Sequence, residues 1–506
     1  MIVVSPLPSW PLPIGDIPSL VLGAAQESKD KVVLVDAVSE RKYTMGEISS
    51  TATQLAAGLV RQGFGGKTIS VFDDTELCCV YVYFAALMAG GAYQSLGTDT
   101  NDREKLRERI VHSQTPIVFT TASYLPRLRS AVDGLDVAIY VLDDRSESNP
   151  RSFVHLLLDD PTFTPVRITT RDDAMASPAY LTYTLESLQP VSLSHFGLLS
   201  SYRSERVSSV DSPCKTTVSA VPFASTHGIV NIAHFPMLSG CCVVQLSKCD
   251  PVSCLASLEK WGAGDFLATY PVLASIVAAA KPAAAGQDGG IIVAGRTYDV
   301  SKLNVIFIHE LRGAHAFKDS VSRLFNARLV EIYGYMETGL IAGIITEYPR
   351  LDGSVGLLSP NIRARIVLDG TELEDGQFGE ILVNTPRLAS STEYFNTGDF
   401  GTVTVDGVVI VKARMTELLR LHDGRIVAPG DIEEQVLQLP GIVDCAVVAA
   451  VSDQDGGYAV PFIFAVSADS QPNSSDLVAP LTKQYPGIDV RRKQYKSTPA
   501  PPFSSY

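Results

Sequence analysis

The chain has 506 residues, of which 46% are hydrophobic and 19% are charged. This length and apolar content support more than one sizeable core, which excludes intrinsically disordered and fibrous classes. The 41 basic and 55 acidic residues give a formal net charge of −14. An acidic chain without basic runs offers no counterion release, so we expect neither nucleic acid nor a membrane as a partner.

The eight cysteines form no Cys-x-x-Cys pair and have no histidine at ligand spacing. We therefore expect no metal site and no disulfide framework. Reduced, mostly buried thiols are typical of an intracellular compartment. The N-terminal sequence has no basic region before an apolar core, unlike a secretory signal, and Ser504-Ser505-Tyr506 is not a peroxisomal address. These features favour a cytoplasmic location.

The first part of the chain alternates between strand-like and helix-like segments. A proline-rich stretch at 6–18 is typical of an extended strap. The uncharged run at 77–98 contains glycines and polar residues, which favours a buried helix followed by a strand over a membrane span. Buried parallel strands are expected at 68–72, 117–120 and 137–142, with a helix at 102–112. This βα repetition predicts a doubly wound sheet.

A second set of strands follows a polar connection near 143–176, which we predict to be the break between two doubly wound subdomains. Its strands are expected at 217–221, 242–246, 265–269 and 304–308. From 363 to 411 the spacing shortens to strand and turn, with Asp406-Gly407 as one turn, which predicts a small β-barrel. A separate module begins after Thr416, with strands expected at 445–451 and 460–466.

Short motifs in the last third of the chain resemble those of a known family. They read Ile-Tyr-Gly-Tyr-Met-Glu at 332–337, Gly-Glu-Ile-Leu-Val at 379–383, Tyr-Phe-Asn-Thr-Gly-Asp at 394–399, Ala-Arg-Met-Thr-Glu-Leu-Leu at 413–419 and Asp-Gly-Arg-Ile-Val-Ala-Pro-Gly-Asp-Ile-Glu at 423–433. In this order and at these separations, they resemble the adenylate-forming superfamily of acyl- and aryl-CoA ligases, peptide-synthetase adenylation domains and luciferases.

This resemblance implies an α/β fold with a large N-terminal body and a small lid. The body would span residues 1–412 and consist of two doubly wound subdomains plus the small β-barrel. The lid would be an α+β domain over 417–506 that is shorter than in relatives. Because the predicted elements follow the same order, the resemblance spans nearly the whole chain.

The chemistry of such enzymes makes strict demands on the site. An acid attacks the α-phosphate of ATP and pyrophosphate leaves, which requires phosphate donors, a divalent metal and a positioned cation. The resemblance implies that Tyr333 stacks on adenine, Glu337 binds Mg²⁺, and Asp399 clasps the ribose hydroxyls. It places Arg414 on ribose or phosphate and Thr416 at the hinge of the lid. The structural alternatives for Asp399 and Arg414 are a turn-capping carboxylate and a lid-facing ion pair.

Two positions depart from the family pattern in ways that weaken phosphate binding. Met336 stands where relatives have a threonine that hydrogen-bonds the α-phosphate, so one contact is lost. A methionine here suits an apolar ligand or simple core packing. The stretch equivalent to the phosphate loop keeps Thr184 but contains Glu186 and has no glycine or lysine. A carboxylate there repels phosphate, so we expect ATP not to bind in the usual pose. Loop decay in a nonfunctional product is the alternative.

Histidines near the predicted acyl pocket are candidate acid–base groups. Ser225 replaces the histidine of the family's Pro-x-Phe-His motif, and His227 follows two positions later. An imidazole beside a pocket titrates near neutrality. His195 and His234 offer the same chemistry, with a hydrogen-bonded packing role as the alternative for each of the three histidines.

The catalytic lysine of the family has no counterpart near the C-terminus. Relatives carry it in a Pro-Lys-Thr-x-Ser-Gly-Lys loop, whereas here Ser497-Thr498-Pro499 is followed by no lysine. Lys493 and Lys496 come too early to be equivalents. Loss of one such electrostatic group typically costs ~10²–10³ in rate.

Three functions follow from this pattern. The first is a fold repurposed for ATP-independent chemistry on an acid- or polyketide-like metabolite in secondary metabolism, with His195, His227, Ser225 and Glu337 as candidate catalytic residues. The second is a metabolite-binding pseudoenzyme, and the third is a divergent, active CoA ligase. A small molecule is the expected partner, and no cofactor is expected unless ligase activity survives, which would require ATP, Mg²⁺ and CoA. The oligomeric state is left open, a homodimer included.

Overall fold

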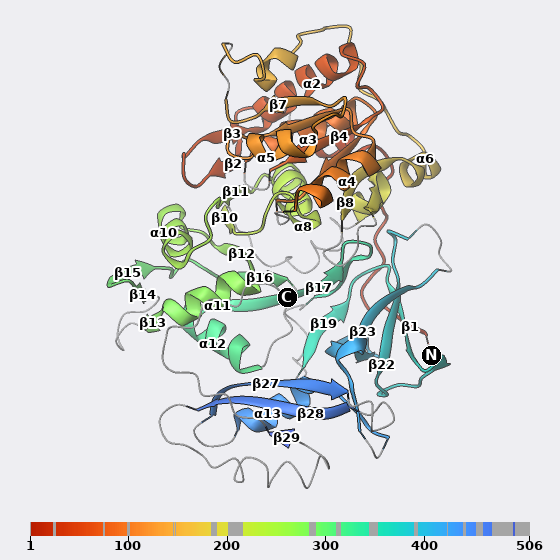
Figure 1. Cartoon of the computed structure of the whole chain (residues 1–506), viewed down its shortest axis with the longest axis vertical. Helices are drawn as coiled ribbons and strands as arrows, with labels where there is room; N and C mark the ends of the chain where they lie inside the picture. Colours follow the sequence, from red (N-terminus) through yellow and green to blue (C-terminus); the bar gives the residue numbers. More distant parts are fainter. Residues whose placement is uncertain are drawn as a thin grey trace.

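The structure is a computed structural model. It describes residues 2–23, 27–73, 76–98, 102–144, 146, 148–183, 190–200, 216–282, 290–309, 315–343, 353–388, 393–421, 424–438, 442–451, 459–467 and 489–490. A first sheet, a second sheet with a barrel-like extension, and a small C-terminal domain follow one another along the long axis (Figure 1). The cysteines of these ranges are free thiols.

The first sheet has the strand order β7-β6-β4-β5-β8-β9 and is parallel except for β9. Its strands are β4 (Thr68–Phe72), β5 (Ala92–Ser95), β6 (Ile117–Thr120), β7 (Ala138–Val141), β8 (Pro178–Tyr183) and β9 (Pro190–Ser194). Its helices are α2 (Met45–Arg61), α3 (Cys79–Met88), α4 (Arg103–Ser113), α5 (Leu125–Ala131) and α6 (Arg171–Ala176), with a 3-10 turn η2 (Phe153–Leu156). The predicted strands at 68–72, 117–120 and 137–142 therefore belong to one doubly wound sheet.

Helix α2 shows how the sequence specifies these elements. The Thr44 side chain caps its N-terminus by accepting a hydrogen bond from the Glu47 amide at 3.1 Å. Ile48, Leu55 and Leu59 recur on one face and are fully buried. Helix α3, by contrast, is buried on every side, and β5 follows it, as predicted from the run at 77–98. In the described part of the chain, no helix is long and apolar enough to cross a bilayer.

The second sheet contains most of the later strands and also the early strands β2 and β3. Its core is β2 (Val32–Asp36), β3 (Lys42–Thr44), β10 (Thr216–Ser219), β11 (Cys242–Gln245), β12 (Asp265–Thr269), β16 (Val305–His309), β17 (Arg328–Tyr335) and β18 (Gly339–Gly343). A small sheet of β13 (Lys281–Pro282), β14 (Gly290–Val293) and β15 (Arg296–Asp299) lies beside it. The helices here are α8 (Thr226–Gly228), the π-helix η3 (Ile229–His234), α9 (Phe235–Ser239), α10 (Pro251–Trp261), α11 (Tyr270–Ala279) and α12 (His315–Phe325). Helix α1 (Ile17–Val21) packs against α3 of the first sheet.

Strand pairing places the passage between the two sheets later than the sequence predicts. Strands β8 and β9 follow the predicted break near 143–176, yet β8 pairs with β5 in the first sheet. The chain therefore leaves the first sheet after Ser194. The domain boundaries themselves stay predictions.

The predicted barrel segment forms antiparallel strands that are continuous with the second sheet. They are β19 (Ser354–Leu358), β20 (Arg363–Leu368), β21 (Thr371–Glu372), β22 (Gly379–Asn384), β23 (Phe395–Val403) and β24 (Val408–Arg414). The strand order begins at β1 (Ile2–Val4), continues as β20-β22-β23-β24-β19 and runs on through β18 and β17. This continuity brings β17, β23 and β24 close together, and the site described below lies there.

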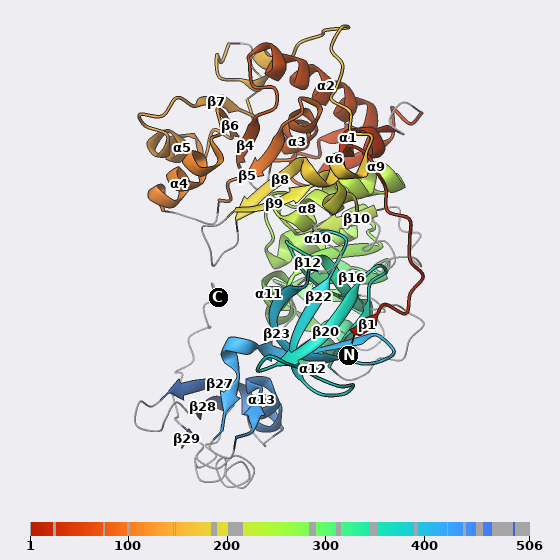
Figure 2. The same cartoon turned by 90° about the vertical axis from the view of Figure 1, so that its right-hand side faces the viewer.

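The C-terminal domain follows the 3-10 turn η4 (Met415–Glu417) and packs beneath the barrel strands (Figure 2). It contains β25 (Leu419–Arg420), β26 (Ile426–Val427), α13 (Pro429–Leu437), β27 (Ile442–Val451), β28 (Ala459–Ser467) and β29 (Asp489–Val490). Ion pairs join it to the body at Lys412–Asp431, 2.7 Å, and Arg420–Asp369, 3.0 Å.

The proline-rich N-terminal segment runs as an extended strap along the body (Figure 2). Its first strand, β1 (Ile2–Val4), pairs antiparallel with β20 of the barrel strands. Farther along, the side-chain amide of Asn361 donates a hydrogen bond to the Trp10 carbonyl at 3.1 Å. The strap ends at α1, where Asp16 caps the helix by accepting a hydrogen bond from the Ser19 amide. It thereby connects the barrel strands to the first sheet.

Candidate functional site

The carboxylate of Asp399, on β23, lies at the centre of a buried polar cluster. Its Oδ2 accepts hydrogen bonds from the Tyr333 hydroxyl, at 2.8 Å, and from the Tyr335 hydroxyl. Its Oδ1 lies 3.1 Å from Nη1 of Arg414. The Asp399 side chain is 1% exposed, so these protein groups replace water around its charge. We call Asp399, Tyr333, Tyr335 and Arg414 the carboxylate cluster.

Arg414 also holds the second tyrosine in place. Its Nη1 donates to the Tyr335 hydroxyl at 2.6 Å and to the Thr397 carbonyl at 2.8 Å, and its guanidinium lies 5.0 Å from the Tyr335 ring centre. Burial, followed by the charge of Asp399, raises the pKa of Tyr333 well above its ordinary value. The Tyr333 hydroxyl therefore remains a hydrogen-bond donor at neutral pH.

Local strand geometry explains why these side chains meet. Asp399 and Arg414 are opposite each other in the β23–β24 ladder. Tyr333 and Tyr335 are two residues apart on β17, so they share a face, and their rings are 6.0 Å apart in an edge arrangement. A Cβ on Gly334 between them would lie 2.1 Å from the Gly339 carbonyl oxygen. Only glycine allows β17 and β18 to approach this closely.

The structure brings together Tyr333, Asp399 and Arg414, which the resemblance assigned to one nucleotide. Their roles toward a ligand stay predictions, and the ion pair that Arg414 forms is with Asp399 of the body. Tyr335 was not predicted from the sequence as a site residue. Its place two residues after Tyr333 on a strand is the signal that would have indicated it.

Met336 and Glu337 form the turn between β17 and β18, and both are half-buried. The guanidinium of Arg387, from the segment after β22, donates to the Met336 carbonyl. This cation, 51 residues away in sequence, was also not predicted. No local pattern marks it, because the contact depends on the barrel strands meeting the second sheet.

The predicted phosphate-loop position lies at the β8–β9 hairpin. The two strands are paired up to Tyr183 and Pro190, and the Tyr183 hydroxyl donates to the Arg109 carbonyl at 3.0 Å. Thr184 lies outside the described residues. Segments around Ser497, Lys493 and Lys496 lie outside them as well.

His195 is 3% exposed, and its Nδ1 accepts a hydrogen bond from the Ile17 amide at 3.1 Å. Because burial disfavours the charged imidazolium, the pKa of His195 is lowered to about 4, although Asp16 opposes this shift. The residue thus fastens the end of the strap to the first sheet in its neutral form. This contact fits the packing alternative, and its predicted acid–base role is not tested by the geometry.

Ser225, His227 and His234 lie on consecutive helical elements. Ser225 caps α8, accepting from the Gly228 amide at 2.9 Å and donating to the Pro222 carbonyl. His227 is half-buried and is the second residue of α8. His234 is fully buried, its Nε2 is 2.7 Å from the Tyr83 hydroxyl, and burial lowers its pKa to about 3. Of these side chains, His227 and Ser225 are the more accessible to a small molecule.

The predicted hinge residue Thr416 lies in η4, between β24 and the C-terminal domain. A hydrogen bond from the Arg414 amide to the Glu417 side chain, 3.0 Å, spans this turn. The hinge is therefore adjacent in sequence to the carboxylate cluster. Motion of the lid stays a prediction.

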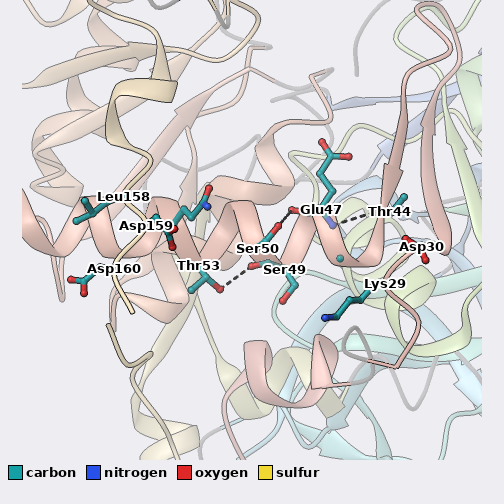
Figure 3. Close-up of a pocket in the computed structure, with 12 residues that line it drawn as sticks. Lys29, Asp30, Thr44, Glu47, Ser49, Ser50, Thr53, Leu158, Asp159 and Asp160 are labelled. Carbon is teal, nitrogen blue, oxygen red and sulfur yellow. Dashed lines mark hydrogen bonds between the residues drawn. The ribbon is translucent and has the colours of Figure 1, made fainter. Parts of the chain in front are cut away.

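A groove of about 510 Å³ runs along the exposed face of α2 (Figure 3). It is lined by Lys29, Asp30, Thr44, Gly46, Glu47, Ser49, Ser50, Thr53, Gln54, Leu158, Asp159 and Asp160. Its hydroxyls bond to the helix itself, as in Thr53 to the Ser49 carbonyl and Ser50 to the Glu47 carbonyl. None of the predicted site residues lines it, so we do not assign the chemistry to this groove. The described residues contain no cluster of three metal-ligating side chains.

Comparison with known proteins identifies the family. The sequence model of the AMP-binding enzyme family matches residues 23–391, more than half of the chain. The chain belongs to the AMP-binding enzyme family. The predicted superfamily is thereby confirmed, whereas the loss of its phosphate loop and lysine is not tested by this match.

Sequence relatives and a solved structure agree with this assignment. The chain is 23% identical over 466 residues to 4-coumarate--CoA ligase-like 8 of Arabidopsis thaliana, covering 87% of this chain and 82% of that protein. It is also 23% identical to the peroxisomal OPC-8:0-CoA ligase 1 of the same plant, covering 91% and 85%. ATP-bound MatB from Rhodopseudomonas palustris superposes with a TM-score of 0.77 at 18% identity, covering 95% of this chain and 96% of that one. The predicted α/β fold with a large body and a small C-terminal domain is confirmed.

Proposed function

We propose that this acyl-CoA-ligase-like protein performs ATP-independent chemistry on an acid- or polyketide-like metabolite, by cyclisation, isomerisation, condensation or hydrolysis. The β8–β9 hairpin carries the proposal. Because these strands pair up to Tyr183 and Pro190, their connection is limited to the six residues 184–189. That connection contains Glu186 and neither glycine nor a basic residue.

These residues do not fit a triphosphate. A phosphate-binding loop needs glycines, so that backbone N–H groups can approach the phosphates, and a lysine to neutralise their charge. A carboxylate in this position repels the ligand. Met336 at the family's threonine position removes another donor. The proposed chemistry therefore does not use ATP.

The proposed chemistry depends on positioning and on proton transfer by side chains of the cleft. Holding a flexible acid in a reactive conformation can lower a barrier by several kcal/mol, about 7–11 at best. Ser225 and His227, at the start of α8, and Glu337, in the β17–β18 turn, are the half-buried proton-transfer candidates. His195 is the buried candidate, and because Nδ1 of its neutral form accepts from the Ile17 amide, its Nε2 carries the proton.

A pyrophosphate-release assay tests the proposal. The purified protein is incubated with ATP, Mg²⁺, CoA and a broad panel of aliphatic and aromatic acids, and metabolites that co-purify are identified by mass spectrometry. We expect no pyrophosphate and conversion of a co-purified metabolite without ATP. Pyrophosphate release that depends on one of the acids would refute the proposal.

A divergent but active CoA ligase is the second candidate. It is favoured by relatives named as CoA ligases that match this chain over most of their length. In that case Lys493 or Lys496 would supply the missing cation, and alanine at the responsible position would abolish pyrophosphate release. Metabolite binding without turnover under any condition would instead support the pseudoenzyme.

A further inference from the structure

We infer that Tyr335 is a specificity-determining residue that keeps nucleosides from binding at the carboxylate cluster, because its hydroxyl takes the place of a ligand hydroxyl on Asp399. The inference rests on the proposed function, since it concerns the same site. It concerns the nucleoside part of ATP, whereas the β8–β9 connection concerns only the triphosphate part.

The Asp399 carboxylate can accept only a limited number of hydrogen bonds. Each oxygen of a carboxylate has two lone pairs. A vicinal diol binds such a group best by donating one hydrogen bond to each oxygen. Here Oδ2 of Asp399 already accepts from the two phenols of Tyr333 and Tyr335, while Oδ1 faces the guanidinium of Arg414. A bridging diol must therefore displace a tyrosine.

Tyr335 is held in this position by several independent contacts. Its hydroxyl donates to Asp399 and accepts from Arg414 at 2.6 Å. Its ring lies under the Arg414 guanidinium and 6.0 Å from the ring of Phe395. Moving Tyr335 aside would break both hydrogen bonds and leave a buried carboxylate short of a donor. A nucleoside would have to offset all of these losses.

Because Asp399 is buried, replacing the Tyr335 hydroxyl with a ligand hydroxyl is unfavourable. The Asp399 side chain is 1% exposed, and the two tyrosines and Arg414 lie around it. In an adenylate-forming enzyme, as the resemblance implies, ribose hydroxyls would donate to this carboxylate. Here two phenols of the protein donate to its Oδ2, so a sugar would have to compete with them.

The test measures binding of adenosine and of 2′-deoxyadenosine to the full-length protein by isothermal titration calorimetry. Adenosine carries no phosphate, so its binding does not depend on residues 184–189. We expect no saturable binding to the wild type. Tyr335→Ala should bind adenosine at least about tenfold more tightly than the wild type and more tightly than it binds 2′-deoxyadenosine, since a charge-assisted hydrogen bond is typically worth a factor of about ten or more.

Companion variants make the test specific. Adding Asp399→Asn to Tyr335→Ala should abolish the gain, because the diol would lose its charged acceptor. Tyr270→Ala, on the exposed start of α11, is the matched control and should leave adenosine binding undetectable. Tyr335→Phe keeps the ring and removes only the hydroxyl, so it tests the hydrogen bond even if the alanine variant fails to fold. It should show a smaller gain with the same preference for adenosine.

Adenosine binding by the wild type with a preference over the deoxy compound would overturn the inference. So would a folded Tyr335→Ala or Tyr335→Phe variant that gains no affinity. The proposed function fails on a different observation, namely acid-dependent pyrophosphate release by the wild type. If the wild type releases no pyrophosphate but binds adenosine, the role of Tyr335 is refuted and the proposed function is not.

Discussion

At His195, a buried hydrogen bond makes the stability of the protein depend on pH. Burial lowers the pKa of this imidazole from 6.5 to about 4 in the folded chain. The unfolded chain therefore binds a proton that the folded chain rejects between these values, so stability is fully present above pH 6.5 and falls as the pH drops toward 4. The loss from this group is on the order of 3 kcal/mol. Chemical denaturation at several pH values measures it.

His195→Asn is the informative variant. Asparagine keeps an acceptor near the Ile17 amide but does not titrate, so the fall in stability between pH 6.5 and 4 should become shallower. Part of the slope should persist, because His234 has a pKa lowered to about 3 and contributes with the same sign. His112→Asn, an exposed position on α4, is the control. An unchanged slope in His195→Asn would contradict the assignment.

At this same scale, the sequence predicted only part of the site. Tyr333, Asp399 and Arg414 were identified because each lies in a short motif with family spacing. Tyr335 and Arg387 were not identified, because their importance comes from contacts across 64 and 51 residues of sequence, with Asp399 and with the Met336 carbonyl. Such contacts depend on how β17, β22 and β23 meet, and no local pattern encodes that meeting.

Between α12 and β17, a buried ion pair offers a test at the scale of elements. Nζ of Lys318 lies 2.5 Å from Oε1 of Glu331, and the two side chains are 8% and 3% exposed. Lys318→Met would leave a buried carboxylate uncompensated, which should destabilise the protein by about 3–5 kcal/mol. Urea denaturation checks this value.

Two companion variants interpret the result. Adding Glu331→Met removes the stranded charge and should restore most of the lost stability. Arg296→Met breaks the more exposed pair with Glu259 and should change stability little. Equal losses of stability in Lys318→Met and Arg296→Met would show that burial of the Lys318–Glu331 pair does not raise the cost of breaking it.

Elements with continuous apolar runs were predicted to within a few residues. The strand expected at 265–269 is β12, and the run at 77–98 is α3 followed by β5. Their environment is encoded locally, because strands covered on both faces are apolar throughout. The partner of a strand is not encoded in this way. The sequence therefore placed the break near 143–176, whereas β8 and β9 extend the first sheet.

For the whole molecule, the strap provides a test of how the parts are joined. Gly407, with a φ of +80°, is packed against Pro6, and a Cβ there would lie 2.4 Å from Cδ of that proline. Gly407→Ala should therefore detach the strap locally and speed cleavage near Trp10 in limited proteolysis. Gly370→Ala is matched, since its φ is +78° but nothing lies within 4 Å of the added carbon. Equal cleavage in both variants would attribute the effect to backbone strain instead of lost packing.

The strap also restricts how the first sheet and the barrel strands can move relative to each other. The chain passes between the two sheets after Thr44 and after Ser194, and the segment from β1 to α1 adds a further link between the barrel strands and the first sheet. Two bodies joined by one connection can swing apart, whereas two bodies joined at separate points form a closed loop with fewer degrees of freedom. Opening between them is therefore restrained by the strap.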